Sequence, residues 1–253
     1  MQGENRVTNS VLRMIGAEKL QAIDLYVIEI LERVFSNVEN LSELDLVVKN
    51  YIDNLTEEEL LILRSYTGYN FKNINAILRN NWTYEENGML NDEIKIKYFE
   101  LIKKLNELVN KFPPLNLDFC TYRGVELNVF KKYGISQLED LISLKGKYMY
   151  EEGFTSTSVN KETSYFNKTL ENGKTYNVEI KYLIPSESAD GILLIDDNLS
   201  YSPNQKEYLL NSGSLVKVLN VSIDSERNLA ELVVVLIPKM LWDLEYNREA
   251  PGR

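Results

Sequence analysis

The spacing of apolar residues divides the chain into two halves. In the first half, apolar residues recur every three or four positions, as they do on one face of an α-helix. Over residues 17–35 this stripe consists of Leu20, Ile23, Val27, Ile28, Leu31, Val34 and Phe35. The pattern predicts helices over residues 17–35, 42–52, 60–66, 71–80 and 93–112. The pair Pro113–Pro114 ends the last helix, because proline cannot continue one.

After the prolines the apolar spacing shortens to every second residue. Residues 175–183 place Tyr176, Val178 and Ile180 on one face and polar side chains on the other, as in a half-buried β-strand. Further strands are predicted over residues 117–122, 191–195, 206–210, 214–222 and 229–237, with a short helix over 136–144. A turn between the last two strands indicates an antiparallel hairpin. We therefore expect an α+β fold, with helices packed on a mainly antiparallel sheet system.

The chain of 253 residues contains no histidine and one cysteine, Cys120. The absence of histidine excludes Ser-His-Asp triads, histidine-based zinc sites and imidazole acid–base catalysis. The single cysteine excludes an internal disulfide, and it lies in an apolar run that is typical of a buried core. Any catalysis must therefore use carboxylates, hydroxyls, amides and cations.

The net charge and the hydropathy pattern exclude further classes. A formal net charge of −10 disfavours a general nucleic-acid binder, because phosphate neutralisation needs a basic surface. No apolar stretch reaches the length of a membrane span, and Met1–Arg13 is too polar for the apolar core of a signal peptide. We expect that the protein either stays inside the producing cell or leaves it by a route that reads no signal peptide.

Three short polar stretches stand at the ends of predicted strands: Thr121–Gly124, Gly153–Ser158 and Gln205–Glu207. In the first stretch, the planar guanidinium of Arg123 could bind a pyrophosphate through paired hydrogen bonds. The neighbouring Gly124 has no side chain, so a ligand could approach the backbone there. In the second, Ser156 and Ser158 share one strand face and could hold a carboxylate and ligand hydroxyls. Each stretch alone is more typical of a turn or a solvated strand than of a site.

Gln205 and Glu207 are two positions apart, so on a strand their side chains project from the same face while Lys206 points away. The carboxylate could accept a hydrogen bond from a sugar hydroxyl and stabilise positive charge at a neighbouring carbon, and the amide could orient an incoming group. Together with a cation and a set of hydroxyls, the pair predicts a site that splits a charged glycosidic bond and transfers the sugar.

The order of these stretches resembles the Arg-Ser-Glu class of mono-ADP-ribosyltransferases, in particular the clostridial and bacillar exotoxins. Ser65–Thr67 followed by Ile74–Arg79 is similar to that family's helical signature, and Glu207–Ser214 is similar to its catalytic strand and the turn after it. The resemblance covers about residues 42–238. It implies an ADP-ribosyltransferase-like fold, with helices packed on two mainly antiparallel β-sheets. The other large class of these enzymes uses a catalytic histidine, which this chain lacks.

The resemblance also implies roles for individual residues. Glu207 is the catalytic glutamate, which hydrogen-bonds the nicotinamide ribose and stabilises an oxocarbenium-like transition state. Gln205 positions the acceptor, Ser156 orients Glu207, and Arg123 acts with Arg79 on the phosphates. NAD is the expected substrate, and no metal is expected. The residues implied to contact NAD are Thr67, Asn75, Arg79, Arg123, Gly124, Ser156, Thr157, Tyr165 and Glu207.

The glutamine at position 205 bears on the acceptor. Family members with glutamate at this position usually modify arginine, whereas those with glutamine, such as the Rho-modifying exoenzymes, usually modify an amide side chain such as asparagine. The resemblance thus implies transfer to an Asn/Gln-type side chain, with a small GTPase as a candidate target. Tyr201 is a candidate for gripping the target protein. Tyr165 falls at the family's nicotinamide-facing aromatic, and Lys168 falls where some members carry arginine.

Alternatives stay open at this point. Water could be the dominant acceptor, which would make the protein an NAD glycohydrolase, or the transfer could be directed to arginine. Asp196–Asp197 could serve a metal-dependent sugar or phosphoryl transferase, although two adjacent acidic residues at a strand end are usually a turn. A non-catalytic binding module on the same fold would bind no NAD.

The expected division of the chain is a helical extension over residues 1–40, an ADP-ribosyltransferase domain over 41–240 and a tail over 241–253. The extension has no counterpart in the family, and its apolar stripe is more typical of core packing than of a partner site. We expect a secreted effector or toxin that acts in the cytosol of a target cell, with a cytoplasmic role in the producer as the alternative. The sequence leaves the target protein, the delivery route and the oligomeric state open.

Overall fold

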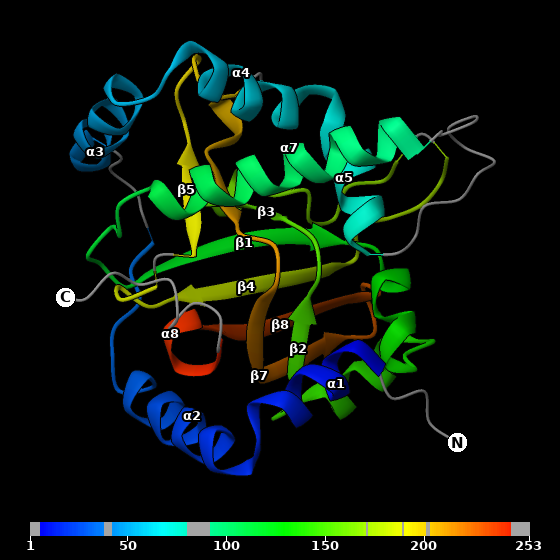
Figure 1. Ribbon diagram of the computed structural model, residues 1–253. Helices are drawn as coiled ribbons and strands as arrows, with labels where there is room; N and C mark the ends of the chain where they lie inside the picture. The colour runs from blue at the N-terminus through cyan, green and yellow to red at the C-terminus, as the bar shows by residue number, and fades with distance from the viewer. Residues whose placement is uncertain are drawn as a thin grey trace.

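The computed structural model describes residues 6–37, 42–79, 92–170, 172–188, 190–200 and 203–243 (Figure 1). Its α-helices are α1 (Arg6–Ile15), α2 (Ala17–Ile30), α3 (Ser42–Asp53), α4 (Glu57–Ser65), α5 (Phe71–Leu78), α7 (Asp92–Lys111) and α8 (Lys239–Trp242). Its strands are β1 (Phe119–Val125), β2 (Tyr148–Glu151), β3 (Thr155–Ser158), β4 (Val178–Ile184), β5 (Gly191–Leu194), β6 (Glu207–Leu210), β7 (Ser214–Asp224) and β8 (Leu229–Ile237). The predicted α+β class is confirmed.

Three predicted helices have a different form in the structure. The helical segment that begins after Thr56, which forms a capping box with Glu59, does not end at residue 66 as predicted. It continues through a π-turn, Tyr66–Asn70, directly into α5, so that the predicted pair forms one bent helical segment. The short helix predicted over residues 136–144 is a 3₁₀ helix, Leu138–Leu144.

The strands form a sheet in the order β2-β7-β8-β4-β1-β3-β6-β5, antiparallel except for the pair β4–β8. The order contains two parts, because β1 and β3 are joined only where Tyr122 pairs with Ser158. The two predicted sheets are thus continuous through one residue pair. Beyond that pair β1 continues alongside β4 and β3 alongside β6, which leaves the sheet split between Arg123 and Ser156.

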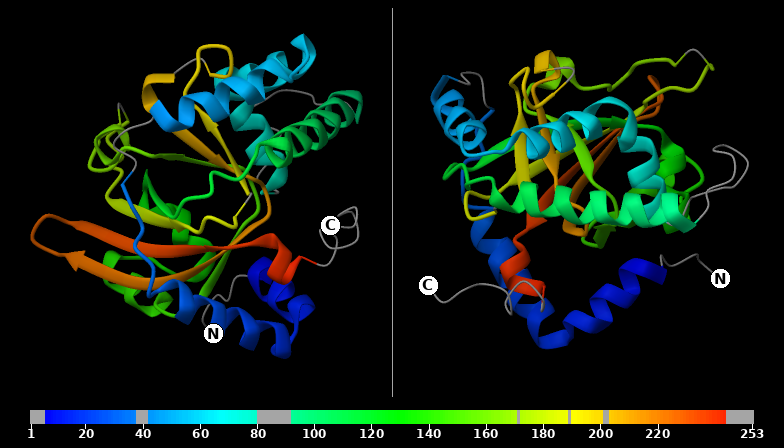
Figure 2. Two further views of the ribbon diagram at one scale, coloured as in Figure 1. Left: turned by 90° about the vertical axis from the view of Figure 1, so that its left-hand side faces the viewer. Right: turned by 45° about the horizontal axis from the view of Figure 1, so that its top comes forward.

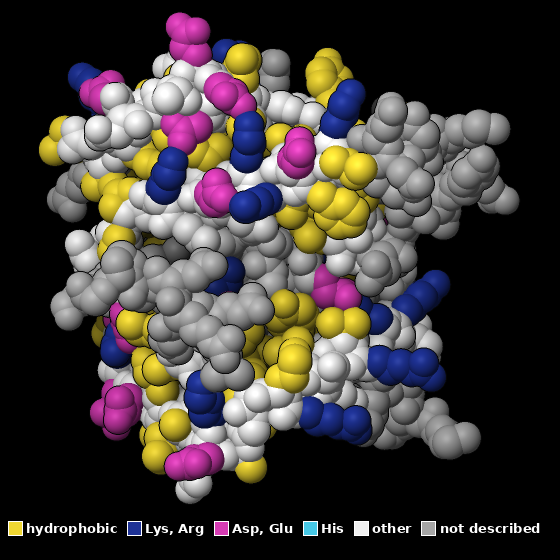
Figure 3. All heavy atoms as spheres, viewed as in Figure 1, with side chains coloured by type: hydrophobic (Ala, Val, Ile, Leu, Met, Phe, Trp, Pro, Cys, Tyr) yellow, Lys and Arg dark blue, Asp and Glu magenta, His cyan; other side chains and the backbone are white. Residues whose placement is uncertain are grey.

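Helices cover the two parts of the sheet from opposite sides (Figures 1 and 2). The helices α3, α4, α5 and α7 enclose one core, in which Leu105 of α7 and Phe112, just after α7, lie with Phe119 and Tyr208 of the sheet. Lys111 of α7 forms an ion pair with Glu59 of α4 at 2.6 Å, and Figure 3 shows Lys and Glu side chains mixed over these outer helices.

The N-terminal helices α1 and α2 belong to a second core on the far side of the sheet. Ile23, Val27 and Ile30 of α2 are buried with Cys120 and Trp242. The stripe predicted over residues 17–35 is therefore only partly core, since Ile28, Leu31 and Val34 are exposed. Cys120 lies in the core, as its sequence context indicates.

Polar contacts also tie this region to the rest of the molecule. The Tyr26 hydroxyl donates to Glu187 at 2.8 Å, and the backbone at Ser36 pairs with Phe119 of β1. The helices of residues 6–30 are thus packed into the fold and do not form a separate unit. Among the helices that the structure describes, none has both the length and the apolar character needed to cross a membrane.

Candidate active site

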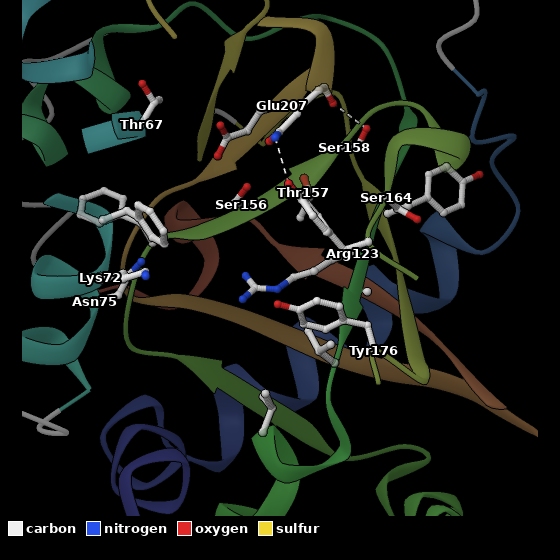
Figure 4. Close-up of a pocket in the computed structure, with 18 of the residues that line it drawn as sticks. Thr67, Lys72, Asn75, Arg123, Ser156, Thr157, Ser158, Ser164, Tyr176 and Glu207 are labelled. Atoms are coloured by element: carbon white, nitrogen blue, oxygen red, sulfur yellow. Dashed lines mark hydrogen bonds between the residues drawn. The ribbon is translucent and has the colours of Figure 1, made fainter. Parts of the chain in front are cut away.

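A cavity of about 770 Å³ opens at the split in the sheet, between the α4–α5 segment and the adjoining ends of β1, β3 and β6 (Figure 4). It brings together Gln205 and all the residues implied to contact NAD: Thr67, Asn75, Arg79, Arg123, Gly124, Ser156, Thr157, Tyr165 and Glu207. A further candidate, Tyr201, lies outside the described residues, and its neighbour Ser200 lines the cavity.

Glu207 is the first residue of β6 and its side chain points into the cavity (Figure 4). It is buried, with 8% of its surface exposed. Burial raises the pKa of the Glu207 carboxyl, while a hydrogen bond from Ser156 and the positive charge of Arg123 act in the opposite direction. A carboxylate held in this way can stabilise positive charge that develops beside it.

Gln205 does not lie on the strand that carries Glu207, which corrects the prediction from strand alternation. It ends a 3₁₀ turn, Pro203–Gln205, and β6 begins two residues later. Between them Lys206 has a φ of 49°, in the left-handed region. Both side chains line the cavity, but a turn places them there and not a shared strand face.

Arg79 and Arg123 place two guanidinium groups in the cavity, from the end of α5 and from β1. Burial lowers the pKa of Arg79, and the like charge of Arg123 lowers it further. Arg79 also donates to the Phe154 carbonyl at 3.4 Å. Because these two cations repel one another in a shared cavity, the binding of an anion between them is favoured. Each planar guanidinium can donate two hydrogen bonds to a phosphate.

Glycines at two positions allow these elements to approach one another. A Cβ on Gly153 would lie 2.5 Å from Asn75 Oδ1 and 3.2 Å from Arg79, so α5 packs directly on the chain before β3. A Cβ on Gly124 would lie 2.3 Å from the Phe166 backbone nitrogen. Gly124 therefore has a packing role, because the segment around Tyr165 fills that space. It also lines the cavity, and its contact with a ligand stays a prediction.

The hydroxyl groups of the serine–threonine stretch on β3 each face a different partner. Ser156 is exposed to the cavity and points toward Glu207 (Figure 4). Thr157 donates to the Tyr208 carbonyl at 2.7 Å, which fixes β3 against β6. Ser158 Oγ lies 2.9 Å from the Gln205 carbonyl oxygen. Ser158 thus contacts the main chain of the Gln205 turn, and not a carboxylate as its strand face indicated.

On the helical side, residues of the predicted signature hold one another. Thr67 of the π-turn donates to the Arg64 carbonyl of α4 at 3.0 Å. The amide of Asn75 donates to the Tyr66 hydroxyl at 3.2 Å, and the Tyr66 ring packs edge-on against Phe154 at 5.4 Å. These contacts tie the helical segment to the start of β3.

Two other candidates are not among the residues that line the cavity. Lys168 lies over the ring of Tyr165, with its ammonium 4.6 Å from the ring centre. Asp196 accepts from the Asn198 backbone at 2.7 Å and so closes a turn. Within the described part of the chain, no group of three His, Cys, Asp or Glu side chains is placed to hold a metal ion.

The cavity also contains residues that the sequence did not indicate. Those that lie outside the predicted stretches are Phe71, Lys72, Val125, Glu126, Asn128, Val129, Thr163, Ser164, Tyr176 and Ser200. Val125 and Ser164 are next to predicted residues in the chain. Tyr176 belongs to the alternating pattern over residues 175–183, but nothing in its spacing points to a cavity.

A buried glutamate beside a serine, with two arginines in one cavity at a split sheet, defines the class of Arg-Ser-Glu ADP-ribosyltransferases. The sequence agrees, because residues 46–237 match the profile of the ADP-ribosyltransferase exoenzyme family. The match spans more than half of the chain, which therefore belongs to this family. The protein is an NAD-dependent mono-ADP-ribosyltransferase of toxin type, as predicted, and NAD is its substrate.

Solved structures share the fold. The C3stau2 protein of S. aureus, solved with NAD, superposes with a TM-score of 0.62 at 18% identity, over 82% of this chain and 100% of that one. An ADP-ribosyltransferase from Clostridium botulinum gives 0.59 at 17%, over 81% and 99%. Plx2a, a toxin from Paenibacillus larvae, gives 0.55 at 24%, over 74% and 90%. Comparison with curated proteins returned no match.

Proposed function

We propose that this enzyme transfers ADP-ribose from NAD to an amide side chain of a target protein. The observation that carries the proposal is the place of Gln205, a neutral amide at the edge of the cavity that holds the buried Glu207. A neutral nitrogen nucleophile needs orientation by hydrogen bonds, whereas a second carboxylate would suit a cationic guanidinium.

The described residues supply the other steps of the reaction. Arg79 and Arg123 bind the pyrophosphate, and Glu207 accepts a hydrogen bond from the nicotinamide ribose while Ser156 orients it. The bond between the ribose carbon and the pyridinium nitrogen breaks, and its electron pair leaves with neutral nicotinamide. The positive charge that develops on the sugar is stabilised by the Glu207 carboxylate. The acceptor nitrogen then bonds to the sugar carbon and loses a proton.

Two acceptors compete with the proposed one. Water is the first, since Gln205 is partly exposed at the edge of the site. A guanidine is the second: the Vis toxin of Vibrio splendidus, of the same fold with a TM-score of 0.53 at 18% identity over 81% of this chain and 90% of that one, was solved with agmatine. The single glutamine at position 205 favours the amide over the guanidine.

We propose a target inside a host cell, with a Rho-type small GTPase as the first protein to test. Delivery to that cell as a secreted effector is part of the same proposal. The expected target class rests on Gln205 and on the resemblance to Rho-modifying exoenzymes.

Labelled NAD tests the acceptor directly. The enzyme is incubated with a purified Rho-type GTPase, with agmatine, or with neither, and labelled protein and free ADP-ribose are measured. We expect Gln205→Ala to lower protein labelling by about tenfold more than NAD hydrolysis, the loss of an orienting hydrogen bond to a reacting group. Gln205→Glu should shift labelling toward agmatine. Equal losses of labelling and hydrolysis in Gln205→Ala would contradict the acceptor role.

A further inference from the structure

The main chain of Gln205 is fixed by hydroxyls from a neighbouring segment. Its carbonyl oxygen lies 2.9 Å from Ser158 Oγ and 3.2 Å from Thr163 Oγ1. Thr163 ends a short 3₁₀ helix, Lys161–Thr163, which leads directly to Tyr165. The turn that carries Gln205 and the segment that carries Tyr165 are therefore joined by hydrogen bonds, although about forty residues separate them in sequence.

The segment that carries Tyr165 is itself held by the sheet. Lys161 Nζ lies 2.7 Å from Glu179 Oε2 on β4, and only 1% of Glu179 is exposed. The backbone at Tyr165 and Phe166 packs on Gly124 without room for a side chain there. An ion pair to a buried carboxylate and a close backbone contact give Tyr165 a defined position at the cavity.

The side chain of Gln205 is bonded to that tyrosine. Its Nε2 donates to the Tyr165 hydroxyl oxygen at 3.0 Å. The Tyr165 ring in turn packs edge-on against Tyr176, with ring centres 5.9 Å apart. An amide that is held through its nitrogen presents its oxygen elsewhere. Among the described residues, Gln205 Oε1 has no hydrogen-bond partner, so the oxygen is the end of the amide that is open to an incoming group.

We propose that the hydroxyl of Tyr165 is a specificity-determining group, which fixes the Gln205 amide so that its oxygen accepts an N–H of the acceptor. The inference rests on the proposed function and narrows it. An acceptor nitrogen with an N–H is oriented toward the ribose carbon, whereas a carboxylate acceptor has no N–H to donate and would meet a second oxygen. The acceptor class is therefore an N–H-bearing side chain and excludes Asp and Glu.

This role is separate from the ring of Tyr165, which the family resemblance sets against nicotinamide. Tyr165→Phe keeps the ring and removes only the hydroxyl. We expect the ratio of protein labelling to NAD hydrolysis to fall about three- to tenfold, the effect of one hydrogen bond to a neutral group. Tyr26→Phe removes a bonded hydroxyl outside the cavity, and it should leave the ratio at the wild-type value. An unchanged ratio in Tyr165→Phe would overturn the proposal.

A double-mutant cycle separates action through Gln205 from a general effect on the site. If Tyr165 acts through the amide, Tyr165→Phe should lower the ratio no further in a Gln205→Ala background. An additive loss in the double variant would show that the hydroxyl acts elsewhere. Thr163→Val and Thr163→Ser form a matched pair for the main-chain contact: only the valine variant, which has no hydroxyl, should lower the ratio.

The contact between Gln205 and Tyr165 can also be observed by NMR without any acceptor protein, so the test does not depend on labelling of a Rho-type GTPase. The chain has four glutamines, so the glutamine side-chain amide spectrum by NMR is simple, and Gln205→Ala assigns the relevant signal. We expect contacts between the Gln205 amide protons and the Tyr165 ring protons in the wild type, and a displaced Gln205 signal in Tyr165→Phe. Absence of both would overturn the inference. Failure of labelling alone would instead count against the proposed target.

Discussion

Lys206 is the residue that allows Gln205 and Glu207 to face one cavity. With a φ of 49° it occupies a conformation that costs a residue with a side chain roughly 1 kcal/mol. Its backbone nitrogen donates to the Pro203 carbonyl at 2.9 Å, and its carbonyl oxygen accepts from Val159 at 3.0 Å. The conformation is therefore held from both sides, and it replaces the strand alternation that the sequence suggested.

The backbone at Lys206 can be tested with two substitutions. Lys206→Gly removes the steric cost of the left-handed region, and NAD turnover should stay near the wild-type rate. Lys206→Val places a branched side chain there, so we expect a loss of about 1–2 kcal/mol in the free energy of unfolding and a fall in turnover. Denaturant unfolding and nicotinamide release measure the two effects. Equal behaviour of both variants would contradict the importance of this turn.

The identity of the main site residues could be predicted from the sequence better than their conformation or their partners. Arg123, Ser156 and Glu207 lie on β1, β3 and β6, and the structure places all of them at the cavity. The conformation of Lys206 could not be predicted, because alternation assumes a continuous strand. The hydrogen bond from Gln205 to Tyr165 also could not be predicted, because the two residues belong to segments far apart in sequence.

At the scale of elements, α2 shows what periodicity leaves undetermined. The helix itself was predicted, but apolar residues occur on more than one of its faces. Ile30 is fully buried against the sheet, while Ile28, two residues earlier, is 60% exposed. Only the packed structure decides which apolar residues form the core, because burial depends on the partner surface.

Truncation of these two isoleucines should therefore have unequal effects. Ile30→Ala removes buried methyl groups and leaves a cavity, and we expect a loss of about 2–4 kcal/mol in the free energy of unfolding. Ile28→Ala should change it by no more than about 0.5 kcal/mol. Denaturant unfolding of both variants gives the comparison. Similar small losses would mean that α2 is only loosely attached to the sheet.

At the scale of the whole molecule, the active site depends on where the sheet divides. Most strands and the α+β class could be predicted from local patterns, although β2 was not. The order β4-β1-β3-β6 could not be predicted, because it is set by pairings between residues far apart in sequence. The single pair Tyr122–Ser158 joins the two parts and leaves the split in which Arg123, Ser156 and Glu207 meet. The cavity is thus formed by the order of the strands, which the sequence motifs alone do not determine.

The central claim is that Glu207 drives cleavage of NAD in this cavity. The most direct measurement compares nicotinamide release and NAD binding, the latter by calorimetry, in the wild type and in Glu207→Gln. Because burial raises the pKa of this carboxyl, its ionised form is disfavoured in the folded state. That penalty on stability appears as the pH rises above the unfolded pKa, so the glutamine variant should be at least as stable as the wild type at neutral pH.

We expect wild-type protein to release nicotinamide, and Glu207→Gln to bind NAD while its turnover falls by at least about a hundredfold, the scale of losing a principal electrostatic group. A Glu207→Gln variant that stays folded, binds NAD and retains wild-type turnover would show that Glu207 does not drive the cleavage.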